Sequence, residues 1–447
     1  MDRRSALTEA FLSTLAFDET THPNLFQAVE EIARDVVTIE KNDPDFASAK
    51  VLQRLTEPDR IVSFRVTWED AQGNVQVNRG WRVQGSQAIG PYKGGLRFHP
   101  SVDEDTLRFL AFEQCFKNAL TGLPLGGAKG GSDFDPKGRS IAEIMRFCQA
   151  FMRQVAPFIG PDRDVPAGDI NVGPREIGYM FGAWRQESGT FGGALTGKGL
   201  SYGGSEMRVE ATGFGLVYFV QNALAERNMT LKDMRVAISG KGNVATHAAQ
   251  KAIQMGAKVV ALSDTSGALI CEDGMSDDLI RWVQAQKDKG GAIDQPPAAY
   301  CATFHTDASP WDVKPDIALP CATQNEMDED MAQTLIDGGC VCVAEGANMP
   351  LTDDAATALR GSDVMHIPGK AANAGGVAVS GLEMSQNSFR RSMTAEKVDD
   401  ALQSIMSDIH KRVAEEGRDG DRIDYVKGAN VAGYRRLAEA IVAQGII

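Results

Sequence analysis

The second half of the chain alternates short apolar runs with amphipathic stretches, and this pattern constrains the fold more than any other feature. Beyond residue 205 it predicts strands at 234–239, 258–262, 316–319, 340–344 and 364–367, and helices at 243–255, 277–287 and 328–336. Parallel strands need long crossover connections, usually helices, so this alternation indicates a parallel sheet covered on both faces. We therefore predict an α/β chain with a doubly wound domain.

The first predicted strand of this half runs into Gly240-Lys-Gly-Asn-Val-Ala245, which opens the next helix. Gly240 permits a tight turn, Gly242 lets the backbone approach a pyrophosphate, and Ala245 allows the helix to pack closely on the sheet. The N–H groups at the start of the helix, near Asn243 and Val244, favour an anion. The pattern predicts a Rossmann-like dinucleotide site, and the alternative is a plain strand-to-helix turn.

Charged residues near this loop bear on which dinucleotide is bound. Ser263 and Asp264 end the next predicted strand, where a carboxylate that accepts hydrogen bonds from a ribose hydroxyl favours NAD. Lys241 inside the loop, with Lys287 and Lys289 further along, can neutralise a 2′-phosphate and favours NADP. We predict NADP, with NAD less favoured; the alternative is that all three lysines are merely solvated.

The first half of the chain predicts helices over 1–55, where apolar residues recur at helical spacing. Residues 61–68 and 75–78 alternate between apolar and polar side chains on either side of a turn, which predicts a hairpin. Ser101 and Glu104 have the spacing of a capping box for a buried helix. Glycine-rich loops with short elements are expected over 122–204.

Two domains account for this organisation. We assign 1–204 to an N-terminal α/β domain and 205–424 to the dinucleotide-binding domain. The tail from residue 393 onward is predicted to be helical, and its last helix, about 425–447, is expected to pack back onto the first domain.

Glycine is concentrated in two windows of the first half. The chain has 46 glycines, and the windows 90–131 and 160–215 hold 22 of them in 98 positions, whereas 1–89 holds three. Glycine this local indicates backbone that turns sharply or approaches a ligand closely. These windows are therefore the candidate site for a small molecule.

Three lysines of these windows stand in glycine-rich or apolar surroundings. They are Lys93, Lys117 and Lys129, and Gln114 shares a helix face with Lys117. Lysines are rarely buried without a partner, so a cluster of ammonium groups suits a dicarboxylate. Lys129 can have a depressed pKa and act in proton transfer, with Asp169 as its carboxylate partner. The alternatives are lysines paired with structural carboxylates and an ordinary turn aspartate.

Charge, hydropathy and cysteine usage exclude several classes of protein. The net charge of -14 argues against a nucleic-acid or membrane-surface partner, no signal peptide is visible, and the longest apolar run, 214–220, is too short to span a bilayer. The seven cysteines show no CxxC spacing, which favours reduced thiols in a cytoplasmic protein. Cys340 and Cys342 are an alternative metal or redox pair, but we predict no metal site.

Seven motifs resemble those of one enzyme family and occur in its order. They are 90–100 (GPYKGGLRFHP), 125–131 (LGGAKGG), 166–169 (PAGD), 210–213 (EATG), 240–245 (GKGNVA), 345–350 (EGANMP) and 369–377 (GKAANAGGV). The chain resembles glutamate dehydrogenase of the hexameric, usually NADP-dependent type, within the Glu/Leu/Phe/Val dehydrogenase family. The resemblance covers nearly the whole chain from about residue 25. It implies a homohexamer whose first domain binds substrate and makes the oligomer contacts.

The resemblance implies reversible deamination of L-glutamate to 2-oxoglutarate and ammonia, with hydride transfer in a cleft between two domains. Lys93 and Ser380 would hold the distal carboxylate of the substrate, Lys117 with Gln114 would hold the α-carboxylate, and the Gly168 backbone would line the substrate. Relatives that act on leucine or phenylalanine have an apolar residue where Lys93 stands. Lys93 therefore predicts glutamate specificity, because an ammonium group facing an apolar side chain would be unpaired.

Catalytic and cofactor roles follow from the same resemblance. Lys129 would polarise the carbonyl and its water, and Asp169 would move protons to and from ammonia. The residues assigned to the cofactor or its side of the cleft are Arg208, Thr212, Gly240, Gly242, Asn243, Val244, Ser263, Asp264, Asn348 and Asn373. Two other hypotheses are a lyase with Lys129 as a Schiff-base nucleophile and a non-catalytic nucleotide sensor. The lyase leaves the dinucleotide loop without a role, and the sensor does not require Lys129 and Asp169.

Overall fold

The computed structural model describes residues 5–300 and 302–446. The chain forms two compact units, each built from separate segments. The first holds Met1–Glu206, Val379–Val398 and Asn430–Ile447, and the second holds Met207–Ala378 and Asp399–Ala429. The chain therefore returns to the first unit twice after it has left it.

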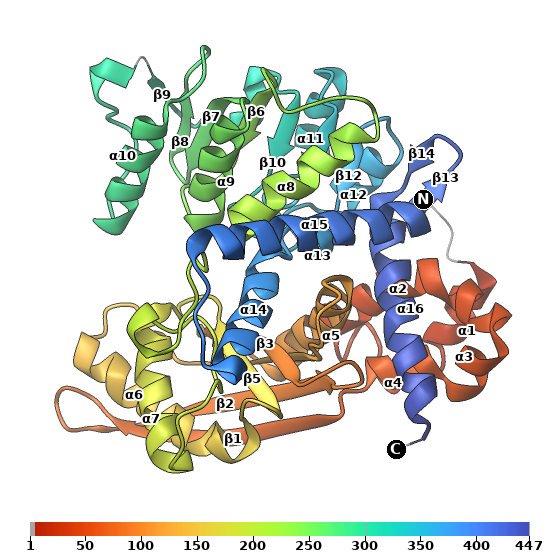
Figure 1. Cartoon of the computed structure of the whole chain (residues 1–447), viewed down its shortest axis with the longest axis vertical. Coiled ribbons are helices and arrows are strands. Elements are labelled where there is room, and N and C mark those ends of the chain that lie inside the picture. Colours follow the sequence, from red (N-terminus) through yellow and green to blue (C-terminus); the bar gives the residue numbers. More distant parts are fainter. Residues whose placement is uncertain (1–4, 301, 447) are drawn as a thin grey trace. The chain divides into compact units, whose positions relative to one another are not determined.

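A five-stranded mixed sheet forms the centre of the first unit (Figure 1). Its strands, in spatial order, are β1 (Arg60–Glu69), β2 (Val75–Ser86), β4 (Gly127–Ser132), β3 (Tyr92–Phe98) and β5 (Asp164–Gly168). The β1–β2 and β2–β4 pairs are antiparallel, whereas β3 runs parallel to β4 and to β5. The predicted hairpin is confirmed as β1 and β2, and the glycine-rich motifs form the three other strands.

Nine helices belong wholly or mainly to the described part of this unit. They are α1 (Ala6–Leu12), α2 (Pro23–Asn42), α3 (Pro44–Ala49), α4 (Val51–Thr56), α5 (Glu104–Leu120), α6 (Ile141–Val155), α7 (Pro174–Ser188), α14 (Gly375–Phe389) and α16 (Tyr425–Gln444). The expectation of only short elements over 122–204 is wrong, because α6 and α7 each have 15 residues. Ser140 and Glu143 form a capping box at the start of α6, a signal that the sequence carried.

The buried helix α5 begins later than its predicted cap. Asp103, and not Ser101, is the N-cap, and its side chain accepts a hydrogen bond from the backbone N–H of Thr106. The Ser101 hydroxyl instead lies 2.7 Å from Nδ1 of His99. The capping-box expectation is therefore wrong by two residues, and the acidic Asp103 also suits the positive end of the helix dipole.

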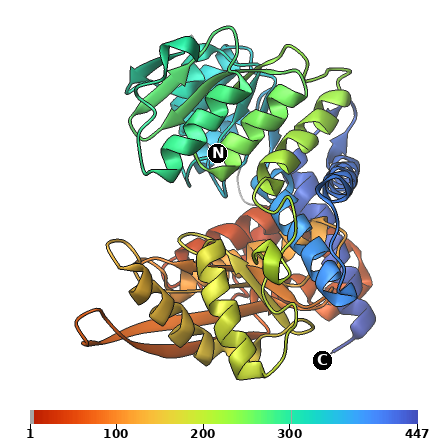
Figure 2. The ribbon, with the colours of Figure 1, turned by 60° about the vertical axis from the view of Figure 1, so that its left-hand side comes forward.

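Helices cover both faces of the first sheet. α6 and α7 pack on β1 and β3 through a core that includes Trp68, Phe98, Phe147 and Phe151, and the two helices lie side by side against the strands in Figure 2. α5 packs on the other face against β2 and β4. The sheet is therefore buried between helices where β3 and β4 run.

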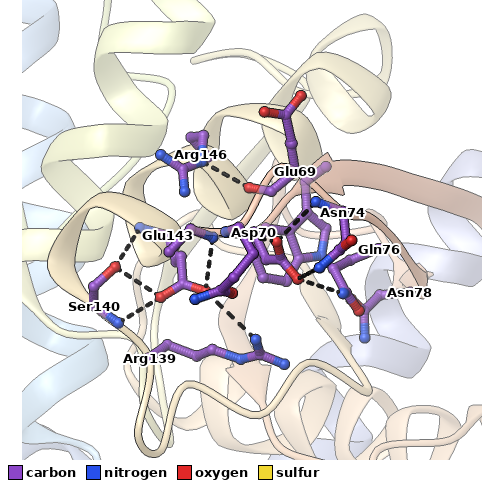
Figure 3. Close-up of polar contacts among 12 residues, drawn as sticks. Glu69, Asp70, Asn74, Gln76, Asn78, Arg139, Ser140, Glu143 and Arg146 are labelled. Atoms are coloured by element: carbon purple, nitrogen blue, oxygen red, sulfur yellow. Dashed lines mark hydrogen bonds and ion pairs between the residues drawn. The ribbon is translucent and has the colours of Figure 1, made fainter.

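The hairpin tip is tied to α6 by a polar cluster (Figure 3). Asp70 accepts hydrogen bonds from the backbone N–H groups of Gln72 and Asn74, which closes the turn. Glu143 accepts from the backbone N–H of Ala71, and Arg146 donates to the carbonyl of Glu69 at 2.7 Å. These contacts fix the start of α6 to the end of β1.

The second unit contains a seven-stranded sheet with helices on both faces (Figure 1). Its strands, in spatial order, are β12 (Met365–Ile367), β11 (Cys342–Ala344), β10 (Ile317–Leu319), β6 (Arg235–Ile238), β7 (Lys258–Asp264), β8 (Gly267–Ile270) and β9 (Thr303–Thr306). The first five are parallel, which confirms the doubly wound fold. The last two are antiparallel and were not predicted, because a tight turn at 265–266 replaces the crossover helix.

Helices fill both sides of this sheet. They are α8 (Ala211–Ala225), α9 (Asn243–Gln254), α10 (Asp277–Asp288), α11 (Glu329–Asp337), α12 (Asp353–Arg360), α13 (Gly369–Ala372) and most of α15 (Ala395–Gly417). A small hairpin, β13 (Arg418–Asp419) and β14 (Arg422–Ile423), follows α15. The predicted helices 243–255, 277–287 and 328–336 are confirmed as α9, α10 and α11, and α12 was missed.

Candidate functional site

Lys93 and Lys129 lie on neighbouring strands of the first unit. β3 carries Lys93 and β4 carries Lys129, and the two residues are only 1% and 5% exposed. Lys93 pairs with Val165 of β5, and Leu96 of β3 pairs with Gly130 of β4. These segments resemble loops in the sequence because glycine has low strand propensity, but strands on both sides complete their hydrogen bonding.

Two glycines of this region are required by close backbone approach. A Cβ at Gly94 would lie 1.6 Å from the carbonyl oxygen of Ala128. At this position there is room only for backbone between β3 and β4. A Cβ at Gly127 would lie 2.3 Å from Sγ of Cys115, so α5 rests directly on the backbone of β4. Glycine therefore brings the helix that carries Gln114 and Lys117 close to the lysine strands.

A buried asparagine that sequence reasoning missed links α5 to these strands. Asn118 donates to the carbonyl of Lys93 at 3.0 Å and also to that of Gly126, just before β4. Its Oδ1 accepts from Nε2 of Gln114 at 2.7 Å. Gln114 and Lys117 are half-buried on the same helix. A polar residue one turn beyond Gln114 in an apolar helix was the available signal.

Lys129 and Asp169 are in direct contact, as predicted for an acid–base pair. Asp169 follows β5, and its Oδ2 lies 3.0 Å from Nζ of Lys129. The same oxygen accepts a hydrogen bond from Nε of Arg97 at 3.0 Å. Arg97 lies on β3, and sequence reasoning gave it no role. The site therefore contains two cations that share one carboxylate oxygen.

Burial and these charges shift both pKa values. Desolvation is the main reason why the pKa of Lys129 is lowered; Asp169 opposes it, and Arg97 and Arg82 reinforce it. Burial acts to raise the pKa of the Asp169 carboxyl, but Lys129 and Arg97 more than offset it, so the pKa lies below its ordinary value. Asp169 is therefore a carboxylate at neutral pH, and Lys129 releases its proton more readily than an exposed lysine.

A second, fully buried ion pair supports strand β3. Arg82 on β2 donates through Nε and through NH2 to the two carboxylate oxygens of Asp164 on β5, at 2.9 and 2.5 Å. Its NH1 donates to the carbonyl of Gly94 at 3.2 Å. Gln84 also donates to Asp164, at 2.9 Å. This network holds the strand that carries Lys93, and it was not apparent from the sequence because its members are about 80 residues apart.

The segment 379–398 places Ser380 in the first unit, where the residue is 1% exposed on α14. One turn later, Glu383 pairs with Lys198 at 2.7 Å, and neither side chain is accessible to solvent. Thr196 precedes Lys198 by two residues, and its N–H donates to the carbonyl of Pro166 on β5. Its buried hydroxyl has no partner among the described residues. Gly168, the last residue of β5, precedes Asp169 directly.

The glycine loop of the second unit has the geometry that its pattern predicts. It joins β6 to α9, and Gly240 has a φ of +83°, in the region that favours glycine. The Gly240 N–H donates to Oγ of Ser263 at 3.1 Å. Gly242 is the N-cap of α9, and a Cβ there would meet no atom within 4 Å, so the space beside it is open. Asn243 and Val244 form the first turn of that helix.

The two residues that pointed to different cofactors are bound to each other. Nζ of Lys241 lies 2.8 Å from Oδ2 of Asp264 and also donates to the carbonyl of Gly291 at 2.8 Å. Oδ1 of Asp264 accepts from the N–H and the hydroxyl of Ser266, at 2.9 and 2.6 Å. Both carboxylate oxygens therefore already accept hydrogen bonds within the protein. Burial acts to raise the pKa of Asp264, but Lys241 and Ser266 outweigh it and lower the pKa.

The remaining cofactor candidates gather at two places in the same unit. Lys287 of α10 donates to Oδ1 of Asn243 at the start of α9. Thr212 lies at the start of α8, where a Cβ added to Gly376 would lie 2.5 Å from its hydroxyl and 3.6 Å from NH1 of Arg208. Lys287 of α10 therefore lies beside the glycine loop as a second lysine. Arg208 and Thr212 lie together at the start of α8.

Asn348 and Asn373 form the second of these places. Nδ2 of Asn373 donates to Oδ1 of Asn348 at 3.2 Å and to the carbonyl of Ala347 at 3.1 Å. Its buried Oδ1 has no partner within the ranges that the structure describes. Glu345, which was given no role, accepts from His366 at 2.7 Å and from the N–H of Gly369 at 2.8 Å. It therefore joins the turns that carry the two asparagines.

The structure does not support the alternative metal or redox role of Cys340 and Cys342. The six cysteines within 5–300 and 302–446 are free and buried, and burial raises the pKa of Cys340 to about 12. No group of three or more His, Cys, Asp or Glu residues suited to a metal ion occurs in those ranges. None of the helices there is long and apolar enough to cross a membrane.

Two family models match the chain. The model described as Glu/Leu/Phe/Val dehydrogenase, dimerisation domain, matches residues 58–186, and the model described as Glutamate/Leucine/Phenylalanine/Valine dehydrogenase matches residues 203–445. The two matches together account for most of the chain and cover every site residue predicted above.

Curated relatives and solved structures match over nearly the full length. The NADP-specific glutamate dehydrogenase of Salmonella typhimurium is 50% identical over 100% of both chains. The NAD-specific glutamate dehydrogenase of Bacteroides fragilis is 50% identical over 98% of this chain and 99% of its own. The crystal structure of Plasmodium falciparum glutamate dehydrogenase has a TM-score of 0.94 at 43% identity, over 99% of this chain and 94% of its own.

Proposed function

The chain belongs to the Glu/Leu/Phe/Val dehydrogenase family, and from that premise we propose that it is an NADP-dependent glutamate dehydrogenase. It catalyses the reversible oxidative deamination of L-glutamate to 2-oxoglutarate and ammonia. The observation that carries the proposal is the buried contact of Lys129 and Asp169, with Lys93 buried on the neighbouring strand. Buried lysines on adjacent strands favour an anionic ligand, and a dicarboxylate suits such a site.

Each end of the substrate has a proposed anchor in the first unit. Lys93 and Ser380, both almost fully buried, hold the distal carboxylate. Lys117, with Gln114 beside it on α5, holds the α-carboxylate, and the Gly168 backbone lines the reacting carbon. Selectivity for glutamate is attributed to Lys93, because a buried ammonium group attracts a carboxylate and disfavours an apolar side chain in its place.

Lys129 and Asp169 divide the proton transfers of deamination. Asp169, held as a carboxylate, accepts the proton that the substrate ammonium loses before oxidation. Hydride leaves the α-carbon and gives an iminium, and neutral Lys129 takes a proton from the water that attacks it. Asp169 returns its proton to the nitrogen of the carbinolamine, ammonia leaves, and the hydroxyl proton passes to the Asp169 carboxylate as the carbonyl forms. Lys129 and Asp169 then each release one proton to solvent. Closing the site would exclude bulk water, apart from the molecule that reacts.

The cofactor is proposed to bind at the glycine loop of the second unit. NADP, when bound, accepts the hydride at its nicotinamide ring. The open space at Gly242 and the N–H groups of Asn243 and Val244 suit the pyrophosphate. Thr212 and Arg208 lie at the start of α8, and the unpartnered Oδ1 of Asn373 beside Asn348 suits an amide donor such as the carboxamide. The residues present therefore fit a dinucleotide.

The choice of NADP over NAD is supported by the contact of Lys241 with Asp264. A carboxylate that selects NAD must accept hydrogen bonds from a ribose hydroxyl, whereas both oxygens of Asp264 already accept from Lys241 and Ser266. The pair is locally neutral, and Lys287 adds a positive charge beside Asn243. A 2′-phosphate is favoured by these charges, and NAD remains the weaker cofactor.

We also propose the finer organisation of the enzyme. Residues 1–204, with the helix at about 425–447, form the substrate-binding and oligomerisation domain, and 205–424 form the dinucleotide-binding domain, except for 379–398, which belong to the first compact unit. The assembly is a homohexamer, and the exposed apolar Val75 and Val77 on β2 are candidates for contact with a second copy. Buried thiols of raised pKa suit the reducing cytoplasm. Sedimentation of the purified chain tests the hexamer directly.

The decisive experiment follows absorbance of the reduced nicotinamide with 2-oxoglutarate and ammonium, first with NADPH and then with NADH. Oxidation that needs both substrates and is faster with NADPH is the expected result. No oxidation with either cofactor would refute the proposed function. Borohydride added during turnover provides the contrast with a lyase, since a Schiff base at Lys129 would be trapped as a stable adduct.

A further inference from the structure

Arg97 shares the carboxylate oxygen that contacts the catalytic lysine. Nε of Arg97 and Nζ of Lys129 each lie 3.0 Å from Oδ2 of Asp169. The side chains of Arg97 and Asp169 are each 16% exposed, and that of Lys129 is 6% exposed. The cluster is therefore mostly out of contact with water, and its three charges must be balanced within the protein.

The cluster contains two basic side chains and one carboxylate, so its charges do not cancel when Lys129 is protonated. A lone lysine and aspartate would each hold the other in its charged form, because loss of the lysine proton would leave a buried carboxylate without a partner. Guanidinium groups as a class keep their positive charge in proteins, and Arg97 places one of them in contact with Asp169. The carboxylate therefore keeps a partner whether or not Lys129 carries a proton.

Further charged groups lie on the elements packed around Lys129. Arg82, which faces β4 from β2, is itself neutralised by Asp164 of β5. Lys93 lies on the adjacent β3, and Lys117 lies on α5, which rests on β4. These groups add cations on neighbouring elements, and Asp169 is the acceptor in contact with Nζ of Lys129.

Strand register holds Arg97 in this place. Arg97 pairs with Gly131, two residues beyond Lys129 on β4. The loop that carries Asp169 is fastened to the next residue of β3, since the N–H of Phe98 donates to Ile170 and Nδ2 of Asn171 donates to the carbonyl of Phe98. The arginine and the aspartate are thus fixed relative to each other by backbone contacts and not by their side chains alone.

We propose that Arg97 is a positioning residue that serves as the permanent counter-ion of Asp169, so that Lys129 can give up its proton without leaving a buried carboxylate unpaired. The inference rests on the proposed function only in taking Lys129 as the proton acceptor of that reaction. Without Arg97, Asp169 would depend on Lys129 alone, and the lysine would stay protonated to higher pH.

The test measures the protonation of Lys129 directly in the full chain. Arg97→Met removes the charge, Arg97→Lys keeps it, and Arg65→Met removes an exposed cation from β1 of the same sheet as a matched control. Brief labelling with acetic anhydride over a pH series, read at Lys129 by mass spectrometry, reports the fraction of neutral amine. The labelling midpoint is expected to move to higher pH in Arg97→Met, to move less in Arg97→Lys, and to stay in place in Arg65→Met.

Kinetics on the same variants supply a second readout. In Arg97→Met, turnover in the deamination direction at pH 7 is expected to fall about tenfold or more and to recover at higher pH, with a smaller change in KM for glutamate. An unchanged labelling midpoint, with or without a loss of activity, would overturn the proposal and leave Arg97 a structural role only. Thermal unfolding and binding of 2′,5′-ADP show whether the variants are folded. If the wild type oxidises no NADPH but the midpoint still moves, the proposed function fails and the charge arrangement stands.

Discussion

In each unit of the molecule a lysine of the proposed site is in contact with an aspartate, and the two contacts have different consequences. In the first unit, Lys129 lies 3.0 Å from Asp169 and is buried between glycine-rich strands. In the second, Lys241 lies 2.8 Å from Asp264 and is about a quarter exposed at the edge of a loop. The residue types and the distances are nearly the same, so the difference must come from the surroundings.

The partners of each pair decide what its lysine can do. Arg97 gives Asp169 a second cation, and burial makes the charged form of Lys129 costly, so this lysine is suited to proton transfer. Lys241 is held by a backbone carbonyl as well as by Asp264, and its side chain is partly exposed to solvent, so it is placed to bind an anionic ligand. The contact between a lysine and an aspartate is therefore not by itself a functional signature.

The largest effect is expected when the catalytic lysine of the first unit is replaced. Lys129→Met should lower kcat by about 10²–10⁴-fold, the range of general acid–base catalysis, because no other group in contact with Asp169 can take up a proton. Steady-state kinetics with NADPH measures the loss. Binding of 2′,5′-ADP should be unchanged in this variant. A variant that keeps more than about a tenth of wild-type turnover would contradict the catalytic role.

A smaller loss is expected at the neighbouring lysine of the substrate site. Lys93→Leu should reduce kcat/KM for glutamate by about 10²-fold, because the distal carboxylate would lose its buried cation. Affinity for 2′,5′-ADP should again be unchanged, as measured by titration calorimetry. An unaltered rate with glutamate would remove the assignment of glutamate as substrate.

The corresponding change in the second unit should alter cofactor preference and not chemistry. Lys241→Ser is expected to lower the ratio of kcat/KM for NADPH to that for NADH by about 10- to 100-fold, the effect of one charge-assisted hydrogen bond. Weaker binding of 2′,5′-ADP with unchanged binding of 5′-AMP would accompany it. Lys232→Ser, at an exposed position outside the loop, is the matched control. If both nucleotides lose affinity equally, Lys241 supports the loop and does not select NADP.

The smallest effect is expected for Asp264→Asn, a variant that distinguishes the role of Asp264 from that of Asp169. Asp264 is proposed to hold Lys241 and not a ribose, so kcat/KM for NADH should change by less than about threefold. The equivalent change in the first unit, Asp169→Asn, would remove the proton carrier and stop turnover. A large loss of NADH activity in Asp264→Asn would instead identify the carboxylate as a ribose acceptor and favour NAD.

Much of the second unit could be predicted because its signals are local. The strands and helices from 234 to 287 follow the apolar pattern of the sequence to within two residues, and the loop at Gly240–Gly242 has the expected conformation. The antiparallel β8 and β9 were missed, since short strands beside a tight turn carry no crossover signal. The helix α12 has only eight residues, too few for a clear helical period.

The first unit was harder to predict, although its site residues were found. Strands β3 and β4 carry neither alternation nor β-branched residues, and they form because neighbouring strands and α5 leave room for backbone only. Lys93, Lys129 and Asp169 stood out by their motifs and are brought to adjacent strands. Three supporting residues did not stand out, because the partner of each belongs to another element, between eight and 82 residues away in the sequence. They are Asn118, Arg82 and Arg97.

The sequence by itself determined the α/β class, the family and the lysines and glycines of both sites, because these depend on spacing over a few residues. The tertiary structure alone decided which group completes each pair. Arg97 meets Asp169 across 72 residues and Lys241 meets Asp264 across 23, and both contacts exist only when parallel strands come into register. Strand register is set by packing of the whole sheet, so it cannot be predicted from a local pattern. It nevertheless decides which partners surround Lys129 and Lys241, and therefore which of the two is suited to proton transfer.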